Sequence, residues 1–206
     1  MSPSIYLEVR QLALKLRDSY GISGPRLTKT DIRRIYKDEG IRLDYRSGFK
    51  NVRGAYYPPP LGPSVVISKR IPEEPQLFTL AHELKHHFFD REVSLSPCGT
   101  SNQDALVEKS AEVFAAELMF PQQLFKEIIE SMGVQLGACS AEDLVHLKMK
   151  TRTTLSYAGI CKVAEFLGYC NRGEFAKTKF TNLQHQIYGK PLYQTINERR
   201  RARSIA

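Results

Sequence analysis

The stretch His82-Glu83-Leu84-Lys85-His86 decides how the rest of this chain is interpreted. Because an α-helix has 3.6 residues per turn, His82 and His86 project from the same face of a helix, about one turn apart. Two imidazoles in this arrangement can hold one Zn²⁺, and Glu83 lies close enough to act on a water bound to that metal. The stretch therefore predicts His82 and His86 as metal ligands and Glu83 as the catalytic acid/base of a zinc hydrolase.

The residues around this motif favour a helix. Pro75 suits a first helical turn, and Glu73 and Glu74 are placed to interact with its positive end. His82 and His86 flank an apolar face, so a metal there would be partly shielded from water. The alternative is a surface helix that carries incidental histidines. The apolar face consists of residues that recur at helical spacing, namely Leu77, Leu80, Ala81, Leu84 and Phe88.

A zinc ion held by two imidazoles needs a third protein ligand and one open position for water. Residues 101–104 have the pattern of a helix start, and the helix is expected to run from Ala105 to about Phe120. Glu108 follows His86 by 22 residues, which is enough for a loop and a return along the motif helix. We therefore expect Glu108 as the third ligand. Glu112, one turn later, could accept a hydrogen bond from the second ring nitrogen of a ligand histidine. The alternative for both glutamates is a solvated helix face.

Two runs of sequence resemble the signatures of the ImmA/IrrE-type metallopeptidases. Phe78-Thr79-Leu80-Ala81-His82-Glu83-Leu84-Lys85-His86 resembles the first signature, and the run from Glu108 to Pro121, with its Phe-Ala-Ala stretch, resembles the second. The segments around Gly54-Ala55-Tyr56 and Val65-Val66-Ile67-Ser68 are also similar. The resemblance covers about residues 40–130.

This resemblance implies a thermolysin-like zinc fold with His82, His86 and Glu108 as ligands and Glu83 as catalytic acid/base. It also implies a regulatory substrate, because related proteases are associated with the DNA-binding repressors that they cleave. The chain departs from the family pattern at three positions. Lys85 replaces a usual glycine, Glu112 stands where Asn or Asp is usual, and Phe120 stands at the usual methionine.

The rest of the chain predicts an α+β fold: a mainly helical, zincin-like domain with a small three-stranded sheet, followed by a helical, helix-turn-helix-like segment. We expect a metallopeptidase domain over 1–132, the helical segment over 133–170 and a basic C-terminal tail over 171–206. Short runs rich in β-branched and aromatic residues predict the strands, with their register left open. The expected elements before the motif are helices over 4–19 and from about 30 to 40, and strands over 41–45, 52–57 and 65–67.

The segment 133–170 contains two amphipathic helices separated by a turn. Ser140-Ala141-Glu142-Asp143 resembles a capping start, Thr153 is the expected cap of the next helix, and Gly168-Tyr169 closes it. Such a unit resembles a helix-turn-helix. Packing or substrate docking is the favoured role. In the alternative, DNA reading, the residues placed in a groove would be Arg152, Thr153, Ser156, Tyr157 and Lys162.

The net positive charge of the chain is concentrated in the C-terminal tail. Residues 171–206 carry 8 Lys and Arg against 2 Asp and Glu, which leaves 22 against 20 in residues 1–170. A tail that includes Arg199-Arg200-Arg201 suits DNA or an acidic protein surface, and the alternative is a solvated terminus. There is no apolar run long enough to span a membrane and no signal-peptide core, so we expect a cytoplasmic protein without a membrane partner. The cysteines form no CxxC pair and are expected to be free thiols: Cys98, Cys139, Cys161 and Cys170.

The favoured function is a site-specific zinc endopeptidase that cleaves a regulatory protein, a helix-turn-helix repressor, in a stress response or in control of a mobile element. The alternative is a non-enzymatic DNA-binding or antitoxin-like regulator that retains a metal site. The His₂Glu set suits Zn²⁺ but is also compatible with Mn²⁺ or Fe²⁺. His87 points about 100° away from the His82/His86 face, so we expect a helix-surface residue or one that supports the site, rather than a ligand. Candidate oxyanion donors are Tyr56, Tyr57, Tyr157 and His146.

Overall fold

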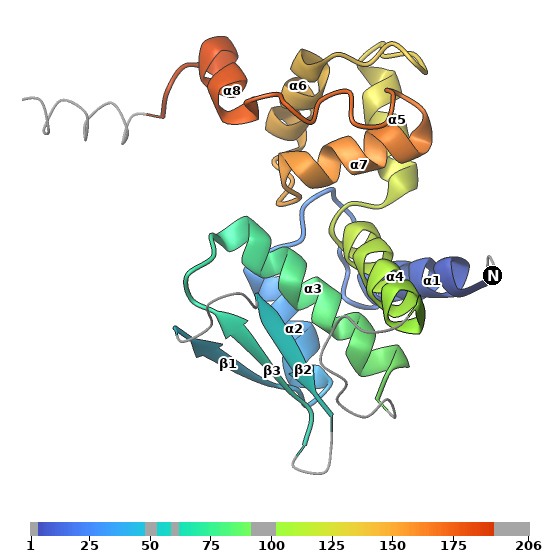
Figure 1. Ribbon diagram of the computed structural model, residues 1–206, viewed down its shortest axis with the longest axis vertical. Helices are drawn as coiled ribbons and strands as arrows, with labels where there is room; N and C mark the ends of the chain where they lie inside the picture. The colour runs from blue at the N-terminus through green and yellow to red at the C-terminus, as the bar shows by residue number, and fades with distance from the viewer. Residues whose placement is uncertain (1–3, 48–52, 59–61, 92–101, 192–206) are drawn as a thin grey trace, which may run out of the picture.

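The computed structural model describes residues 4–47, 53–58, 62–91 and 102–191. Within these residues the chain forms eight helices and one three-stranded sheet, which confirms the expected α+β, mainly helical fold. The elements make two bodies that are seen one above the other in Figure 1. The lower body contains the sheet and helices α1 to α4, and the upper body contains helices α5 to α8.

The sheet lies beside the motif helix and has the strand order β1-β3-β2. Strands β1 (Arg42–Arg46) and β3 (Ser64–Ser68) run parallel, and β2 (Gly54–Tyr57) is antiparallel to β3. Val65 and Ile67 of the central strand β3 are completely buried, because they share the face of the strand that belongs to the core packed against α3. The three predicted strands are confirmed, and β2 is left at one edge of the sheet.

Helix α3 (Glu73–Phe89) carries the motif and packs against α4 (Asn102–Met119), which also packs against α1 (Ser4–Ser19). Ala111 and Ala115 of α4 are fully buried, and such small side chains allow close approach of neighbouring helices. The expected helices over 4–19 and 105–120 are therefore present with nearly the expected bounds.

Two buried hydrogen bonds to backbone carbonyls fix these helices. Tyr36 of α2 (Lys29–Asp38) donates to the Leu80 carbonyl of α3 at 2.8 Å. Arg17 of α1 donates to the Leu118 carbonyl of α4 at 2.6 Å. Both donors are nearly inaccessible to solvent, so these bonds face little competition from water.

The upper body consists of α5 (Gln122–Ser131), α6 (Ala141–Thr151), α7 (Tyr157–Leu167) and α8 (Phe180–Tyr188). Helix α5 contacts α6 and α7 and so belongs to the upper body. The expected domain bounds of 1–132, 133–170 and 171–206 stay a prediction.

The caps of the upper body differ in one respect from expectation. Ser140 and Asp143 form the predicted capping box of α6. The cap of α7 is Ser156 and not Thr153, because the Thr153 hydroxyl accepts the Leu155 N–H inside the preceding turn. Sequence reasoning mistook this first hydroxyl for the cap.

Helix α8 lies within the segment expected to be a basic tail. Its Phe180 stacks on Tyr157 of α7, with ring centroids 4.7 Å apart. Helix α8 also packs against α6. Residues 180–188 are therefore part of the folded upper body. The predicted helix start at Ser101, Cys98 and the basic run Arg199–Arg201 lie outside the described residues.

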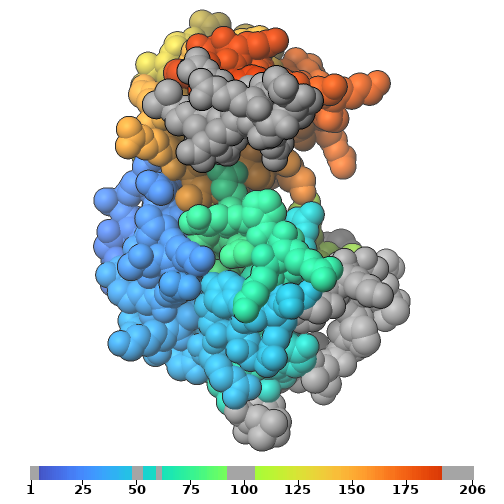
Figure 2. Space-filling view, turned by 90° about the vertical axis from the view of Figure 1, so that its left-hand side faces the viewer, coloured from blue at the N-terminus to red at the C-terminus, as the bar shows by residue number. Residues whose placement is uncertain are grey.

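Polar contacts join the two bodies, which Figure 2 shows in contact from a second side. Lys148 of α6 binds Glu74 of α3 at 2.8 Å and also donates to the Leu155 carbonyl at 2.7 Å. Thr154 donates to the Leu27 carbonyl at 2.8 Å. The upper body is thus held to the N-terminal end of α3.

Cys139, Cys161 and Cys170 are buried free thiols. Burial raises the pKa of Cys139 and Cys161 to about 12 and that of Cys170 to about 11. These thiols therefore stay protonated near neutral pH. In the described ranges, no helix combines the length and apolar character needed to cross a bilayer.

Gly54 gives a direct test of how tightly β2 packs on α3. A Cβ added there would lie 2.5 Å from Thr79 Cγ2 and 2.8 Å from Ile67 Cδ1. We expect Gly54→Ala to lower the free energy of unfolding by about 1–3 kcal/mol through overpacking, measured by urea denaturation. Gly24→Ala is the matched control, because no atom lies within 4 Å of its added Cβ. Equal stabilities of the two variants would contradict this packing.

Candidate metal centre

The two motif histidines face one another on α3. Their Nε2 atoms are 3.2 Å apart and their ring centroids 5.0 Å apart. Both side chains are mostly buried, at 16% and 14% exposure. His82 and His86 therefore direct the same ring nitrogen to one partly shielded point, as their spacing of four residues predicts.

Glu108 of α4 completes the group. Its Oε2 lies 3.2 Å from His82 Nε2, and its Oε1 lies 3.6 Å from His86 Nε2. In tetrahedral coordination with bonds of about 2.05 Å, donor atoms are about 3.3 Å apart, so the observed separations fit one zinc ion. His82, His86 and Glu108 form the one possible metal-binding group of three or more such residues found in the described part of the chain.

Glu83 is buried beside this group, with only 6% of its surface exposed. Burial is the largest effect on its carboxyl and raises its pKa, partly opposed by the neighbouring His82 and His86. The backbone N–H of Tyr56 in β2 donates a hydrogen bond to the Glu83 carboxylate. The strand thus holds the predicted catalytic glutamate against the three candidate ligands.

Asp90, at the C-terminal end of α3, is the residue that the sequence reasoning missed. His86 Nδ1 donates to Asp90 Oδ2 at 2.8 Å, which leaves Nε2 of the same ring unprotonated to bind a metal. The signal in the sequence was a carboxylate four residues after the second histidine, one helical turn further on.

Glu112 does not take the position expected for it. Its carboxylate pairs with Lys109 at 3.3 Å and with Lys162 of α7 at 3.5 Å, and 42% of the side chain is exposed. Burial would raise its pKa, but these two ammonium groups outweigh burial and lower it. Asp90 holds His86 instead, because it lies on the same helix one turn away while Glu112 turns toward α7.

Three of the four candidate oxyanion donors have other hydrogen-bond partners. Tyr56 contacts His87 Nδ1 at 3.2 Å, Tyr157 donates to Gln184 at 2.7 Å, and His146 contacts Tyr188 at 2.7 Å. Tyr157 and His146 belong to the upper body. The upper body contacts α3 at Glu74, near the N-terminal end of that helix. At a rise of 1.5 Å per residue, Glu74 lies about 12 Å along the helix axis from His82. Tyr57 is 38% exposed on β2.

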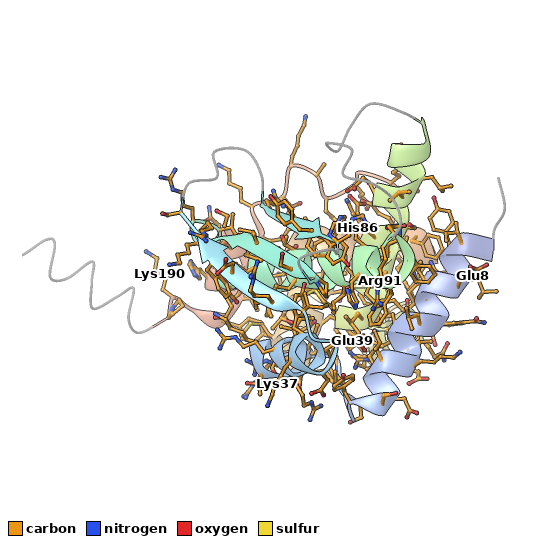
Figure 3. The ribbon with its side chains drawn as sticks, turned by 90° about the horizontal axis from the view of Figure 1, so that it is seen from below. Glu8, Lys37, Glu39, His86, Arg91 and Lys190 are labelled. Carbon is orange, nitrogen blue, oxygen red and sulfur yellow. The ribbon has the colours of Figure 1, made fainter. Side chains whose placement is uncertain are left out.

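His87 is buried rather than exposed on the helix surface. Besides Tyr56 it contacts Arg91 and, at 3.5 Å, Glu39 at the end of α2. Figure 3, in which His86, Arg91 and Glu39 are labelled, shows this region between the ends of α2 and α3. His87 therefore ties β2 and α2 to the motif helix and is not a ligand.

Asp90 and Glu112 can be separated by metal affinity. We expect Asp90→Asn to weaken Zn²⁺ binding by roughly 10- to 100-fold, because the ring of His86 loses its charged acceptor. Glu112→Gln should leave affinity within about twofold, since its partners are lysines at a partly exposed site. Competition with a chromophoric chelator measures both dissociation constants. The reverse order would restore the role predicted for Glu112.

The pKa of Asp90 predicts a pH dependence of stability. Burial alone would raise this pKa, but hydrogen bonds from His86 and Lys85 outweigh it and lower the pKa below its usual value. Such a carboxyl stabilises the fold above its unfolded pKa of about 3.9 and loses this effect as the pH falls through the folded value. With metal removed, urea denaturation of wild type and Asp90→Asn should therefore differ most above about pH 5 and converge at lower pH. A difference that stays constant down to about pH 3 would argue against this role.

Comparison with known proteins agrees with this geometry. Among solved structures, a Mycobacterium tuberculosis transcriptional regulator matches with a TM-score of 0.52 and 14% identity over 78% of this chain and 52% of that chain. This chain thus spans about half the length of that regulator, and the likeness concerns the fold alone. No curated protein gives a significant match.

A family model described as the IrrE N-terminal-like domain, which denotes a peptidase family, matches residues 37–158. The matched region is more than half of the chain and contains the sheet, the motif helix and all three candidate ligands. This chain therefore belongs to the IrrE N-terminal-like domain family.

Proposed function

We propose that the protein is a zinc-dependent endopeptidase that cleaves a regulatory protein. The observation that carries this proposal is a buried Glu83 next to three convergent ligands, His82, His86 and Glu108. A purely structural zinc site has no use for a buried carboxylate at this position, because its four positions are filled by ligands. The peptidase family match supports the same activity.

When bound, zinc would polarise the scissile carbonyl and lower the pKa of its water toward about 7. Glu83 accepts the proton released by the attacking water and passes it to the leaving amine. Burial raises the pKa of this carboxyl, which brings it closer to neutral and suits a group that must both take up and release a proton.

The edge strand β2 gives an extended substrate a place to bind. Ser68 donates to the Arg53 carbonyl, so the alternate residues Gly54 and Tyr56 direct their backbone groups away from β3. One of these groups, the Tyr56 N–H, reaches Glu83. A peptide that pairs with this edge would therefore run beside the candidate metal centre.

A DNA-binding repressor remains the substrate that we propose, in a stress response or in control of a mobile element. The family resemblance of the motif and the similar fold of a Mycobacterium tuberculosis transcriptional regulator support a regulatory context. Such a substrate would dock on the upper body, whose Lys162 pairs with Glu112 on α4, the helix that carries Glu108.

The activity test compares wild type with Glu83→Gln on helix-turn-helix repressors from the same genome, with zinc supplied. We expect wild type to cut one of them at a single site and Glu83→Gln to be at least about 10²-fold slower, because proton transfer is lost. Both proteins should bind zinc equally in a chelator competition. Equal cleavage by the two proteins would sink the proposed mechanism.

DNA binding by the C-terminal part is the second candidate, favoured by the excess of basic residues after position 170. Thr153 is buried and Tyr157 is covered by Phe180, so any contact with DNA would rely on exposed basic side chains. Removal of residues 192–206, which leaves α8 in place, should abolish salt-sensitive DNA binding if this function is correct. Unchanged DNA binding would show that residues 192–206 are not the DNA-binding element.

A further inference from the structure

Lys85 is buried between α3 and α4, where a charged side chain is unusual. It is 1% exposed, and it lies between Leu84, which is in the core, and the candidate ligand His86. A buried ammonium without a partner costs several kcal/mol, so its contacts must compensate for its burial. Those contacts lead to two of the candidate metal ligands.

The first contact is to the carboxylate that holds His86. Lys85 Nζ donates to Asp90 Oδ2 at 2.7 Å, and the same oxygen accepts the His86 Nδ1 hydrogen bond at 2.8 Å. The ammonium thus fixes the oxygen that sets the orientation and tautomer of the imidazole. It also balances the charge of Asp90, so the buried pair is close to neutral.

The second contact is to the backbone that carries the third ligand. Lys85 Nζ donates to the Val107 carbonyl at 3.3 Å, and Val107 directly precedes Glu108. The same carbonyl accepts the Ser110 hydroxyl at 2.7 Å. One ammonium on α3 is therefore bonded to the first half of α4, next to the glutamate that faces both histidines.

We propose that Lys85 is a positioning residue that couples the orientation of His86 to the position of Glu108 and so pre-organises the three metal ligands. The inference rests on the metal site of the proposed function and is independent of peptide hydrolysis. An apolar residue of similar length would fill the same space but could not bind either oxygen. The role thus belongs to the ammonium and not to packing by the stem.

The test measures metal binding to the purified, metal-free protein. We expect Lys85→Met to raise the Zn²⁺ dissociation constant by roughly 10-fold or more in competition with a chromophoric chelator. The visible absorption spectrum of the Co²⁺-loaded protein should also change, because it reports the geometry of the ligands. Lys109→Met is the matched control, since Lys109 is an exposed lysine on α4 that pairs with Glu112 at 3.3 Å. It should bind both metals as wild type does.

A double-mutant cycle with Asp90→Asn tests the route of the effect. If Lys85 acts through Asp90, Lys85→Met should weaken binding less in the Asp90→Asn background than in wild type. Circular dichroism of the metal-free variants controls for folding. Should Lys85→Met fail to fold, Lys85→Gln, which keeps a polar N–H donor, takes its place and should show a smaller loss.

Three results would each contradict a different part of the proposal. A folded Lys85 variant with wild-type affinity, or tighter binding, and an unchanged Co²⁺ spectrum rejects the positioning role. Additive effects in the cycle reject the route through Asp90. Failure of the wild-type protein to bind Zn²⁺ or Co²⁺ rejects the metal site itself, and with it the proposed function.

Discussion

Glu108 reaches the two imidazoles only because α4 packs closely on α3, and the rest of the site depends on this contact. Ala111 and Ala115 are fully buried, and their small side chains let neighbouring helices approach α4 closely. At the C-terminal end of α4, Arg17 donates a hydrogen bond to the Leu118 carbonyl. A carboxylate displaced by one or two ångströms could no longer share one ion with both histidines, because zinc–ligand bonds are short and narrowly distributed. Helix packing therefore sets the geometry of the candidate metal site.

The sheet imposes the second constraint. Gly54 lets β2 approach α3 so closely that a methyl group would collide with Thr79 and come within 3.3 Å of Glu83 Oε1. This closeness allows the Tyr56 N–H to hold Glu83, and it also removes water from the carboxyl and raises its pKa. The strand proposed to align a substrate is thus also the strand that packs against the candidate acid/base Glu83.

The histidine motif, the three strands and the main helices could be predicted because each depends on local spacing and composition. Glu108 was also predicted, since zinc needs a third ligand and the 22 residues after His86 allow a loop and a return along the motif helix. Glu112 pairs with lysines and Asp90 was missed for the same reason: which carboxylate meets a ring nitrogen depends on how helices rotate against their neighbours. Helix α8 was not predicted, because the excess of Lys and Arg in residues 171–206 was interpreted as a basic tail.

By itself the sequence determined that the candidate ligands His82 and His86 lie together on one helix, because a period of 3.6 residues places them on one face. It also determined that Glu83 would stand next to them. The tertiary structure decided which groups surround this set: Asp90 behind His86, the Tyr56 amide on Glu83, and Lys85 between the two ligand helices. These contacts join residues from separate elements, and only the packing of those elements sets their distances.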